Sequence, residues 1–130
     1  PRPGMFALDI SSGDQKWYTP AQDVCAGRDF CQPGLSAASS SIPGGVPGGA
    51  MDGHKRAYRA DEGKDIWDVD TAREFNSLSG TRVRGGSIGG GSGPVLSENM
   101  LYLNSGYGIY FHMPGNVLLA FERTGEPGEK

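Results

Sequence analysis

A run of arginine, glycine and serine carries the side chains in this chain that are best suited to binding a charged ligand. It comprises Arg82, Arg84, Gly85, Gly86 and Ser87. A guanidinium recognises a carboxylate well, because its fork of N–H donors matches the two carboxylate oxygens. Adjacent glycines let backbone N–H groups approach an anion or a flat ring closely. The run therefore predicts a binding site for an anionic ligand.

A second group of polar residues, Asn104, Ser105 and Tyr107, stands at the end of an expected strand. Their amide and hydroxyl groups are candidates to reach the same ligand, because loop residues at one end of a sheet commonly share a site. Structural roles are the alternative. The arginines can pair with nearby Glu74, and Asn104 can satisfy loop backbone.

The sequence offers no convincing catalytic base and no metal site. His54 follows a turn and His112 lies on an expected loop, and neither has clustered cysteine or carboxylate partners, so zinc is not expected. Asp52 precedes Gly53 and is expected to serve this Asp-Gly turn. The Gly89–Gly91 run lacks the lysine and the following helix of a phosphate-binding loop.

The two cysteines, Cys25 and Cys31, lie on one expected loop with five residues between them. They are too far apart for C-x-x-C redox chemistry, and the histidine of a haem attachment motif is missing. A disulfide that closes a small loop fits an oxidising compartment, whereas two free thiols fit a cytosolic protein. The sequence leaves both interpretations open.

The elements that must position these residues are indicated by one pattern that occurs twice, as ALDISSGDQKW and AYRADEGKDIW. Its members are Ala7, Gly13 and Trp17 in the first copy and Ala57, Gly63 and Trp67 in the second. A period near fifty residues is typical of a supersecondary unit that is used again, as in propeller blades. The polar glycine turn predicts a β-hairpin, with the tryptophan covering the gap to a neighbouring sheet. We therefore expect both tryptophans to be largely buried between adjacent sheets.

Composition agrees with an all-β chain and excludes several functions. The 130 residues include 22 glycines and 9 prolines, and no long stretch has helical periodicity. A net charge of -3 argues against an electrostatic nucleic-acid binder, and no apolar run is long enough to cross a membrane. With 36% hydrophobic residues, the chain is lean for an independent core and holds one domain at most.

Assigning strands to blades predicts a partial β-propeller of about two to three blades. Residues 1–19 supply the outer hairpin of one blade, residues 36–69 a complete blade and residues 93–121 three strands of a further one. The complete blade is expected to have strands near Ser36–Ile42, Val46–Met51, His54–Ala60 and Asp65–Val69. Its second strand should be short, bulged or at an edge, because Pro47 and the flanking glycine pairs weaken it.

The long connections, residues 20–35, 72–93 and 106–115, are all expected at one end of the blades, where we place any functional site. Tolerated insertions are the alternative. Because residues 1–19 lack inner strands and residues 93–121 lack an outer one, we expect the chain to be a fragment of a larger propeller. Other blades, or other copies of the chain, should cover its open sheet edges.

The sequence also resembles a known family. The repeat resembles the tryptophan-docking repeat of quinoprotein dehydrogenases, which are eight-bladed propellers that hold pyrroloquinoline quinone (PQQ). More specifically, six segments resemble, in this order, the C-terminal part of polyvinyl-alcohol-dehydrogenase-like proteins. They are CAGRDFCQPGLSAA from Cys25, MDGHKRAY from Met51, WDVDTAREF from Trp67, RGGS from Arg84, NSGYG from Asn104 and PGNVLLAF from Pro114.

This resemblance implies oxidation of a secondary or polymeric alcohol, with PQQ and Ca²⁺ as cofactors and a haem protein, cytochrome c, as the electron acceptor. It implies a periplasmic or secreted protein, and it makes the two polar groups described above candidates to bind PQQ. The catalytic base and most Ca²⁺ ligands are expected outside this chain, which by itself should be inactive. The alternative is a non-enzymatic PQQ-repeat propeller that acts as a scaffold or binding module.

Overall fold

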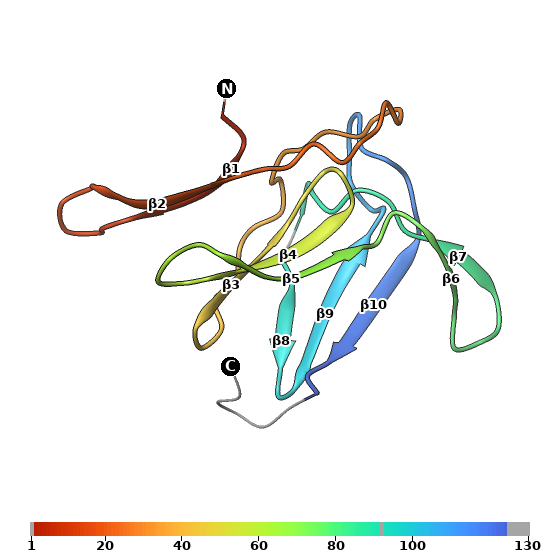
Figure 1. Ribbon diagram of the computed structural model, residues 1–130. Helices are drawn as coiled ribbons and strands as arrows, with labels where there is room; N and C mark the ends of the chain where they lie inside the picture. Colours follow the sequence, from red (N-terminus) through yellow and green to blue (C-terminus); the bar gives the residue numbers. More distant parts are fainter. Residues whose placement is uncertain (1, 92, 125–130) are drawn as a thin grey trace.

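The computed structural model describes residues 2–91 and 93–124, and these form strands and loops without a helix (Figure 1). The strands are β1 (Gly4–Leu8), β2 (Gln15–Pro20), β3 (Gly45–Gly49), β4 (His54–Arg59), β5 (Asp65–Asp70), β6 (Glu74–Asn76), β7 (Arg82–Arg84), β8 (Val95–Ser97), β9 (Met100–Ser105) and β10 (Val117–Glu122). The all-β prediction is confirmed. Among the described residues, no helix long and apolar enough to cross a membrane is found.

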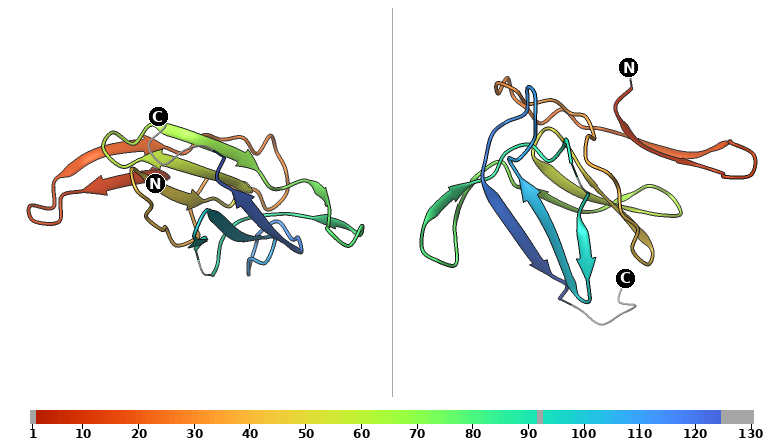
Figure 2. Two further views of the ribbon diagram at one scale, coloured as in Figure 1. Left: turned by 90° about the horizontal axis from the view of Figure 1, so that it is seen from below. Right: turned by 180° about the vertical axis from the view of Figure 1, so that it is seen from behind.

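The strands form small separate sheets, all of them antiparallel. The sheets are the hairpin β1–β2, the three-stranded sheet β3–β4–β5, the hairpin β6–β7 and the three-stranded sheet β10–β9–β8. Figure 2 shows the β1–β2 and β6–β7 hairpins projecting on opposite sides of the two larger sheets. This succession of small antiparallel sheets along the chain is consistent with propeller blades.

The two copies of the repeat have the same strand pairing. Ala7 lies opposite Trp17 in the first hairpin, and Ala57 lies opposite Trp67 in the second. In both copies the register shifts directly after the alanine, which marks a β-bulge at the same place. The two copies of the sequence repeat therefore form the same hairpin structure, including the β-bulge.

The turns of the two hairpins agree as well. Gly13 has a φ of 77° and Gly63 a φ of 72°, in the region that favours glycine. The Gly13 N–H donates to the Asp9 carbonyl at 2.8 Å, and the Gly63 N–H donates to the Arg59 carbonyl at 2.9 Å. The turn glycine is needed in both copies for its backbone conformation.

Each tryptophan contacts the next three-stranded sheet along the chain. The Trp17 indole lies directly against Gly63, and its Nε1–H donates to the Ala60 carbonyl at 3.0 Å. The Trp67 ring meets Phe121 of β10 edge to face, with ring centroids 5.1 Å apart. Both tryptophans have most of their surface covered, although neither is completely buried, which agrees with the expectation that they pack between adjacent sheets. The remaining exposure arises because β2 and β5 are the edge strands of their sheets.

The predicted inner strand at residues 36–42 is not formed, and this is the first correction. This segment makes only isolated bridges, Leu35 to Ala50, Ser36 to Gly89 and Ile42 to Gly45. Its serines and alanines have low strand propensity, and the Ser40 hydroxyl bonds to the Pro94 carbonyl at 2.6 Å. The sheet over residues 36–69 therefore has three regular strands, with the short β3 at its edge, as expected from Pro47.

A second correction concerns residues 72–93, which were expected to be a long connection. They contain the β6–β7 hairpin, in which Phe75 pairs with Val83 and Asn76 with Arg82. The Ser77 hydroxyl accepts a hydrogen bond from the Thr81 N–H at 3.1 Å and closes the turn. Three-residue strands give too short an alternation to stand out in a sequence. The strands expected near residues 100–104 and 117–121 are confirmed as β9 and β10.

Candidate functional site

Three loops meet at one end of the two larger sheets, shown at the top of Figure 1. They are the loop that follows β2, the segment after β7 and the loop between β9 and β10. The Ser87 N–H donates to the Met113 carbonyl, the Gly106 N–H to the Ser87 carbonyl and the Ile88 N–H to the Ala50 carbonyl, each at 2.9–3.0 Å. The segment after β7 thus joins the β9–β10 loop to the β3–β4 turn.

The predicted glycines lie where backbones pack closely. A Cβ atom on Gly85 would overlap the Thr71 carbonyl, and one on Gly86 would overlap the Met113 carbonyl. Close packing between chain segments therefore already requires glycine at both positions. Their role as ligand contacts stays a prediction.

Two of the predicted hydroxyl groups lie inside this packing. The Ser105 hydroxyl is buried, accepts from the Gly86 N–H at 2.9 Å and lies 2.7 Å from the Thr71 hydroxyl. The Ser87 hydroxyl donates to the Met51 carbonyl at 2.6 Å and accepts from the Met113 N–H at 2.9 Å. These bonds hold the loops in place.

Asn104 and Tyr107 have different surroundings, because both are exposed. Together with Ser87 they line a small hollow of about 120 Å³, whose other lining residues are Ile88, Gly89 and Gly91. The structure therefore brings three of the predicted cofactor-binding residues together. The amide and phenol groups point to hydrogen bonding as the chemistry of this hollow.

The two predicted arginines are separated. Arg82 is 79% exposed and forms an ion pair with Glu74 at 3.4 Å, which is the structural alternative weighed from the sequence. Arg84 makes no ion pair with a described residue and instead lines a larger hollow of about 440 Å³. The lining residues of this larger hollow are Arg28, Asp29, Phe30, Ala72, Arg84, Gly85, Met113 and Pro114.

One wall of the larger hollow belongs to a loop closed by a disulfide. Cys25 and Cys31 are bonded, with Cα atoms 5.5 Å apart. Inside this loop the Arg28 guanidinium donates to the Cys25 and Val24 carbonyls at 3.2 and 3.4 Å. Sequence reasoning missed Arg28 and Phe30. A charged and an aromatic residue between two cysteines that could bond would have indicated a binding loop.

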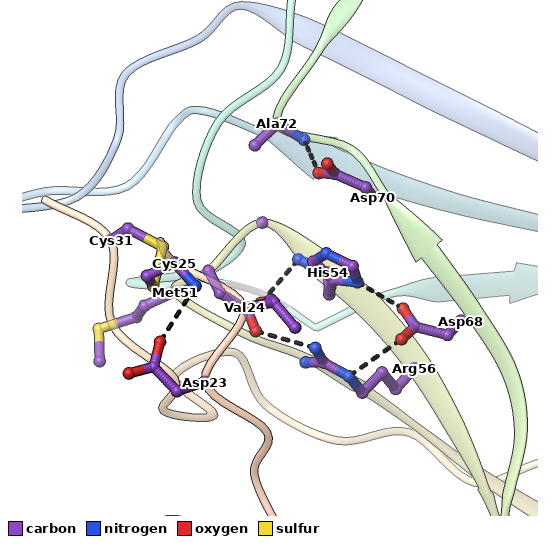
Figure 3. Close-up of polar contacts among 12 residues, drawn as sticks. Asp23, Val24, Cys25, Cys31, Met51, His54, Arg56, Asp68, Asp70 and Ala72 are labelled. Atoms are coloured by element: carbon purple, nitrogen blue, oxygen red, sulfur yellow. Dashed lines mark hydrogen bonds and ion pairs between the residues drawn. A yellow bond between two sulfur atoms is a disulfide. The ribbon is translucent and has the colours of Figure 1, made fainter. Parts of the chain in front are cut away.

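A network of four charged or titratable side chains lies on β4, β5 and the turn before them (Figure 3). The buried Asp52 accepts from Arg56 at 2.9 Å and from the His54 N–H at 2.8 Å. Arg56 also lies 3.3 Å from Asp68, which in turn lies 2.7 Å from His54 Nδ1. The expected turn role of Asp52 is confirmed. The pairing of Arg56 with Asp68 across β4 and β5 was missed, because it depends on strand register.

Burial and ion pairing shift the pKa of the Arg56 guanidinium in opposite directions. Desolvation lowers the pKa of Arg56, but the hydrogen bond that Arg56 donates to Asp52 and the charges of Asp52 and Asp68 outweigh it, and the pKa lies above its ordinary value. Arg56 is therefore a permanent positive charge shared by two carboxylates.

Lys55, which directly precedes Arg56 on β4, has no such partner among the described residues to compensate for its burial. Its side chain is completely buried, and its Nζ makes no hydrogen bond with a described residue. Burial lowers the pKa of this amine from 10.5 to about 8. Sequence reasoning did not single out this residue.

No protein-family model matches the chain. The chain is similar to two curated proteins, which confirms the resemblance inferred from the sequence. It is 36% identical over 136 residues to a polyvinylalcohol dehydrogenase of a Pseudomonas species and 37% identical over 138 residues to one of Sphingopyxis sp. (strain 113P3). In each comparison 96% of this chain is covered, and the chain spans about a fifth (21%) of the relative's length.

Proposed function

We propose that this chain, which is similar to polyvinylalcohol dehydrogenases over 96% of its length, is part of a PQQ-dependent dehydrogenase that oxidises a secondary or polymeric alcohol. The observation that carries the proposal is this similarity, because it runs through both the docking hairpins and the loops that form the two hollows. Blade packing alone would not require similar loops. Residues outside this chain are needed for the complete activity.

The smaller hollow fits part of a flat, polar cofactor. The Asn104 side-chain amide makes no hydrogen bond with a described residue, and the exposed Tyr107 offers a hydroxyl beside it. These groups would bind and orient carbonyl or carboxylate oxygens of PQQ. Bound PQQ supplies hydride acceptance, while Ser87 and Ser105 keep the loops that carry the donors in position.

Calcium is proposed to be held by other parts of the protein. Among the described residues, no group of three or more His, Cys, Asp or Glu side chains is placed to hold a metal ion. This chain's own contribution would then be to bind and position the organic cofactor.

The compartment and partners belong to the same proposal. The Cys25–Cys31 disulfide supports a periplasmic or secreted protein, where such bonds persist. Further blades would cover the open edges of the sheets, and cytochrome c would take up the electrons. The relatives' names support a dehydrogenase role and say nothing of the acceptor.

The test is a titration of the intact protein with PQQ, followed by tryptophan fluorescence, and an assay of dye-linked alcohol oxidation. Replacing Asn104 by Ala and Tyr107 by Phe should weaken PQQ binding about tenfold or more, because each lost hydrogen bond to a charged group is worth about 1.5–3 kcal/mol. Arg82→Gln, which alters an exposed ion pair with Glu74, is the matched control and should bind PQQ normally. An intact protein that neither binds PQQ nor oxidises alcohols would refute the proposal.

A non-enzymatic propeller remains the second candidate. It is favoured by the buried Ser105 and Gly86, two predicted ligand contacts that the structure uses for packing. A scaffold of this kind should fold normally and show no response to PQQ. The same titration therefore separates the two candidates.

A further inference from the structure

The larger hollow is built by four segments of the chain. They are the disulfide loop with Arg28 and Phe30, the connection after β5 with Ala72, the end of β7 with Arg84, and the loop before β10 with Met113 and Pro114. It has no lining residue in common with the smaller hollow. The two hollows are therefore separate features of the described surface.

The charges around the larger hollow favour an anion. The lining includes two arginines, Arg28 and Arg84, and one acidic residue, Asp29, so the net charge of the lining residues is positive. The Arg28 side chain is tied to two backbone carbonyls, which fixes its position and leaves further N–H donors. Arg84 is exposed and its guanidinium forms no ion pair with a described residue, so its fork of donors is not engaged by a carboxylate of the described chain.

The rest of the lining is apolar and contains strained backbone. Phe30 has a φ of 59° and Phe111, which stacks on it with ring centroids 6.5 Å apart, has a φ of 54°. This region is unfavourable for residues with a side chain and is held only where the surroundings demand it. Ala72, Met113 and Pro114 add apolar surface beside the rings. A hollow lined by both an aromatic residue and arginines suits a ligand with an apolar body and one charged end.

From these observations we propose that the larger hollow is a carboxylate-binding site. Arg84 pairs with the carboxylate, Arg28 adds positive charge, and Phe30 packs against the apolar body of the ligand. The disulfide between Cys25 and Cys31 keeps Arg28 and Phe30 in place when no ligand is bound.

The proposal is tested by isothermal titration of the intact protein with benzoate, which joins a carboxylate to an apolar ring. Benzoate should bind saturably to the unmodified protein, and Arg84→Gln should weaken binding about tenfold. Arg82→Gln removes an arginine two residues away on the same strand, but not in the hollow, and should change the affinity less than twofold. Benzamide, which lacks the charge, should bind equally to the unmodified protein and to Arg84→Gln.

Folding of each variant is checked by its thermal unfolding. If Arg84→Gln does not fold, Arg84→Lys replaces it and should give an intermediate affinity, because lysine keeps the charge and loses the fork. Absence of saturable benzoate binding, or equal weakening by the Arg82 and Arg84 variants, would overturn the proposal.

The carboxylate can come from a resident cofactor or from a diffusible ligand, and a second titration distinguishes the two. If it belongs to PQQ, loading the protein with PQQ should abolish benzoate binding, and Arg84→Gln should weaken PQQ binding. If it belongs to a diffusible ligand, the PQQ-loaded protein should bind benzoate with unchanged affinity. Both results support a carboxylate site at Arg84.

Discussion

At the scale of single residues, neighbouring charged side chains of β4 differ in how their burial is compensated. Arg56 is buried against two carboxylates, and Asp52 accepts two hydrogen bonds although none of it is exposed. Lys55 is buried just as completely, with no hydrogen bond to a described residue. Removing these side chains should therefore change the stability in opposite directions, because a paired charge contributes to it and an unpaired one costs.

Lys55→Met should raise the free energy of unfolding at pH 7 by about 3 kcal/mol, since the pKa falls from 10.5 to about 8 and each unit corresponds to about 1.4 kcal/mol. The unfolded chain holds this proton up to about pH 10.5, whereas the folded chain releases it near pH 8. The folded state should therefore gain stability between these two pH values, and the advantage of the variant should shrink there. Denaturant unfolding at a series of pH values measures both effects. Lys64→Met, on an exposed turn, is the control, and a destabilised Lys55→Met would contradict the prediction.

Asp52→Ala should lower the free energy of unfolding by about 3–5 kcal/mol, because it leaves Arg56 buried with one carboxylate and the His54 N–H without its acceptor. Asp61→Ala removes an exposed partner of Arg59 and should have little effect. Urea denaturation of the two variants makes the comparison. Equal losses would mean that the Asp52 network is not a stabilising unit.

At the scale of elements, the hairpin turn is the part that joins one sheet to the next. The Trp17 indole lies on the turn of the following hairpin, against Gly63 and the Ala60 carbonyl. In the described residues nothing lies within 4 Å of the position that a Gly13 side chain would take. The two turns thus have the same backbone conformation, but only one has an indole against it.

Comparing Gly63→Ala with Gly13→Ala separates two contributions to the loss of stability, namely the strained backbone conformation and the collision with Trp17. Both should lose about 1–2 kcal/mol, because both glycines have positive φ. Gly63→Ala should lose more, since its methyl group also collides with the Trp17 ring. Unfolding of chain 1–130 measures the difference, which should disappear when both variants are made in a Trp17→Ala background. If Gly63→Ala still loses more stability than Gly13→Ala in the Trp17→Ala background, the additional loss does not come from the contact with Trp17.

At the scale of the whole molecule, the chain exposes much apolar surface. Ile10 is fully exposed, Leu8 and Leu118 are 62% and 64% exposed, and the β1–β2 sheet has only two strands. A two-stranded sheet is marginally stable by itself, and open edges with apolar side chains tend to associate. Since the chain spans about a fifth of its relatives' length, further protein against these surfaces is the expected state.

The isolated chain 1–130 should therefore associate with itself and should lack alcohol dehydrogenase activity even with PQQ and Ca²⁺. Sedimentation velocity measures the association, and the dye-linked assay measures the activity. The intact protein, prepared in the same way, is the positive control for the assay. A compact monomer that oxidises alcohol with PQQ would contradict the need for further blades. It would also contradict the proposal that residues outside this chain complete the active site.

The sequence by itself determined the features that depend on neighbouring residues. The hairpins around Gly13 and Gly63, the turn at Asp52 and the edge position of Pro47 follow from local backbone preferences and from alternation along a strand. The sequence also determined the similarity to the alcohol dehydrogenases, because that similarity lies in the order of the motifs. Cys25 and Cys31 allowed a disulfide without requiring one.

Only the tertiary structure decided which of the candidate residues share a site. Arg82 and Arg84 stand two residues apart, yet one pairs with Glu74 and the other meets Arg28 from a loop more than fifty residues earlier. The burial of Lys55 likewise depends on the packing of its sheet. Contacts of this kind are set by how sheets and loops pack, and a pattern along the chain carries no information on distances between its distant parts.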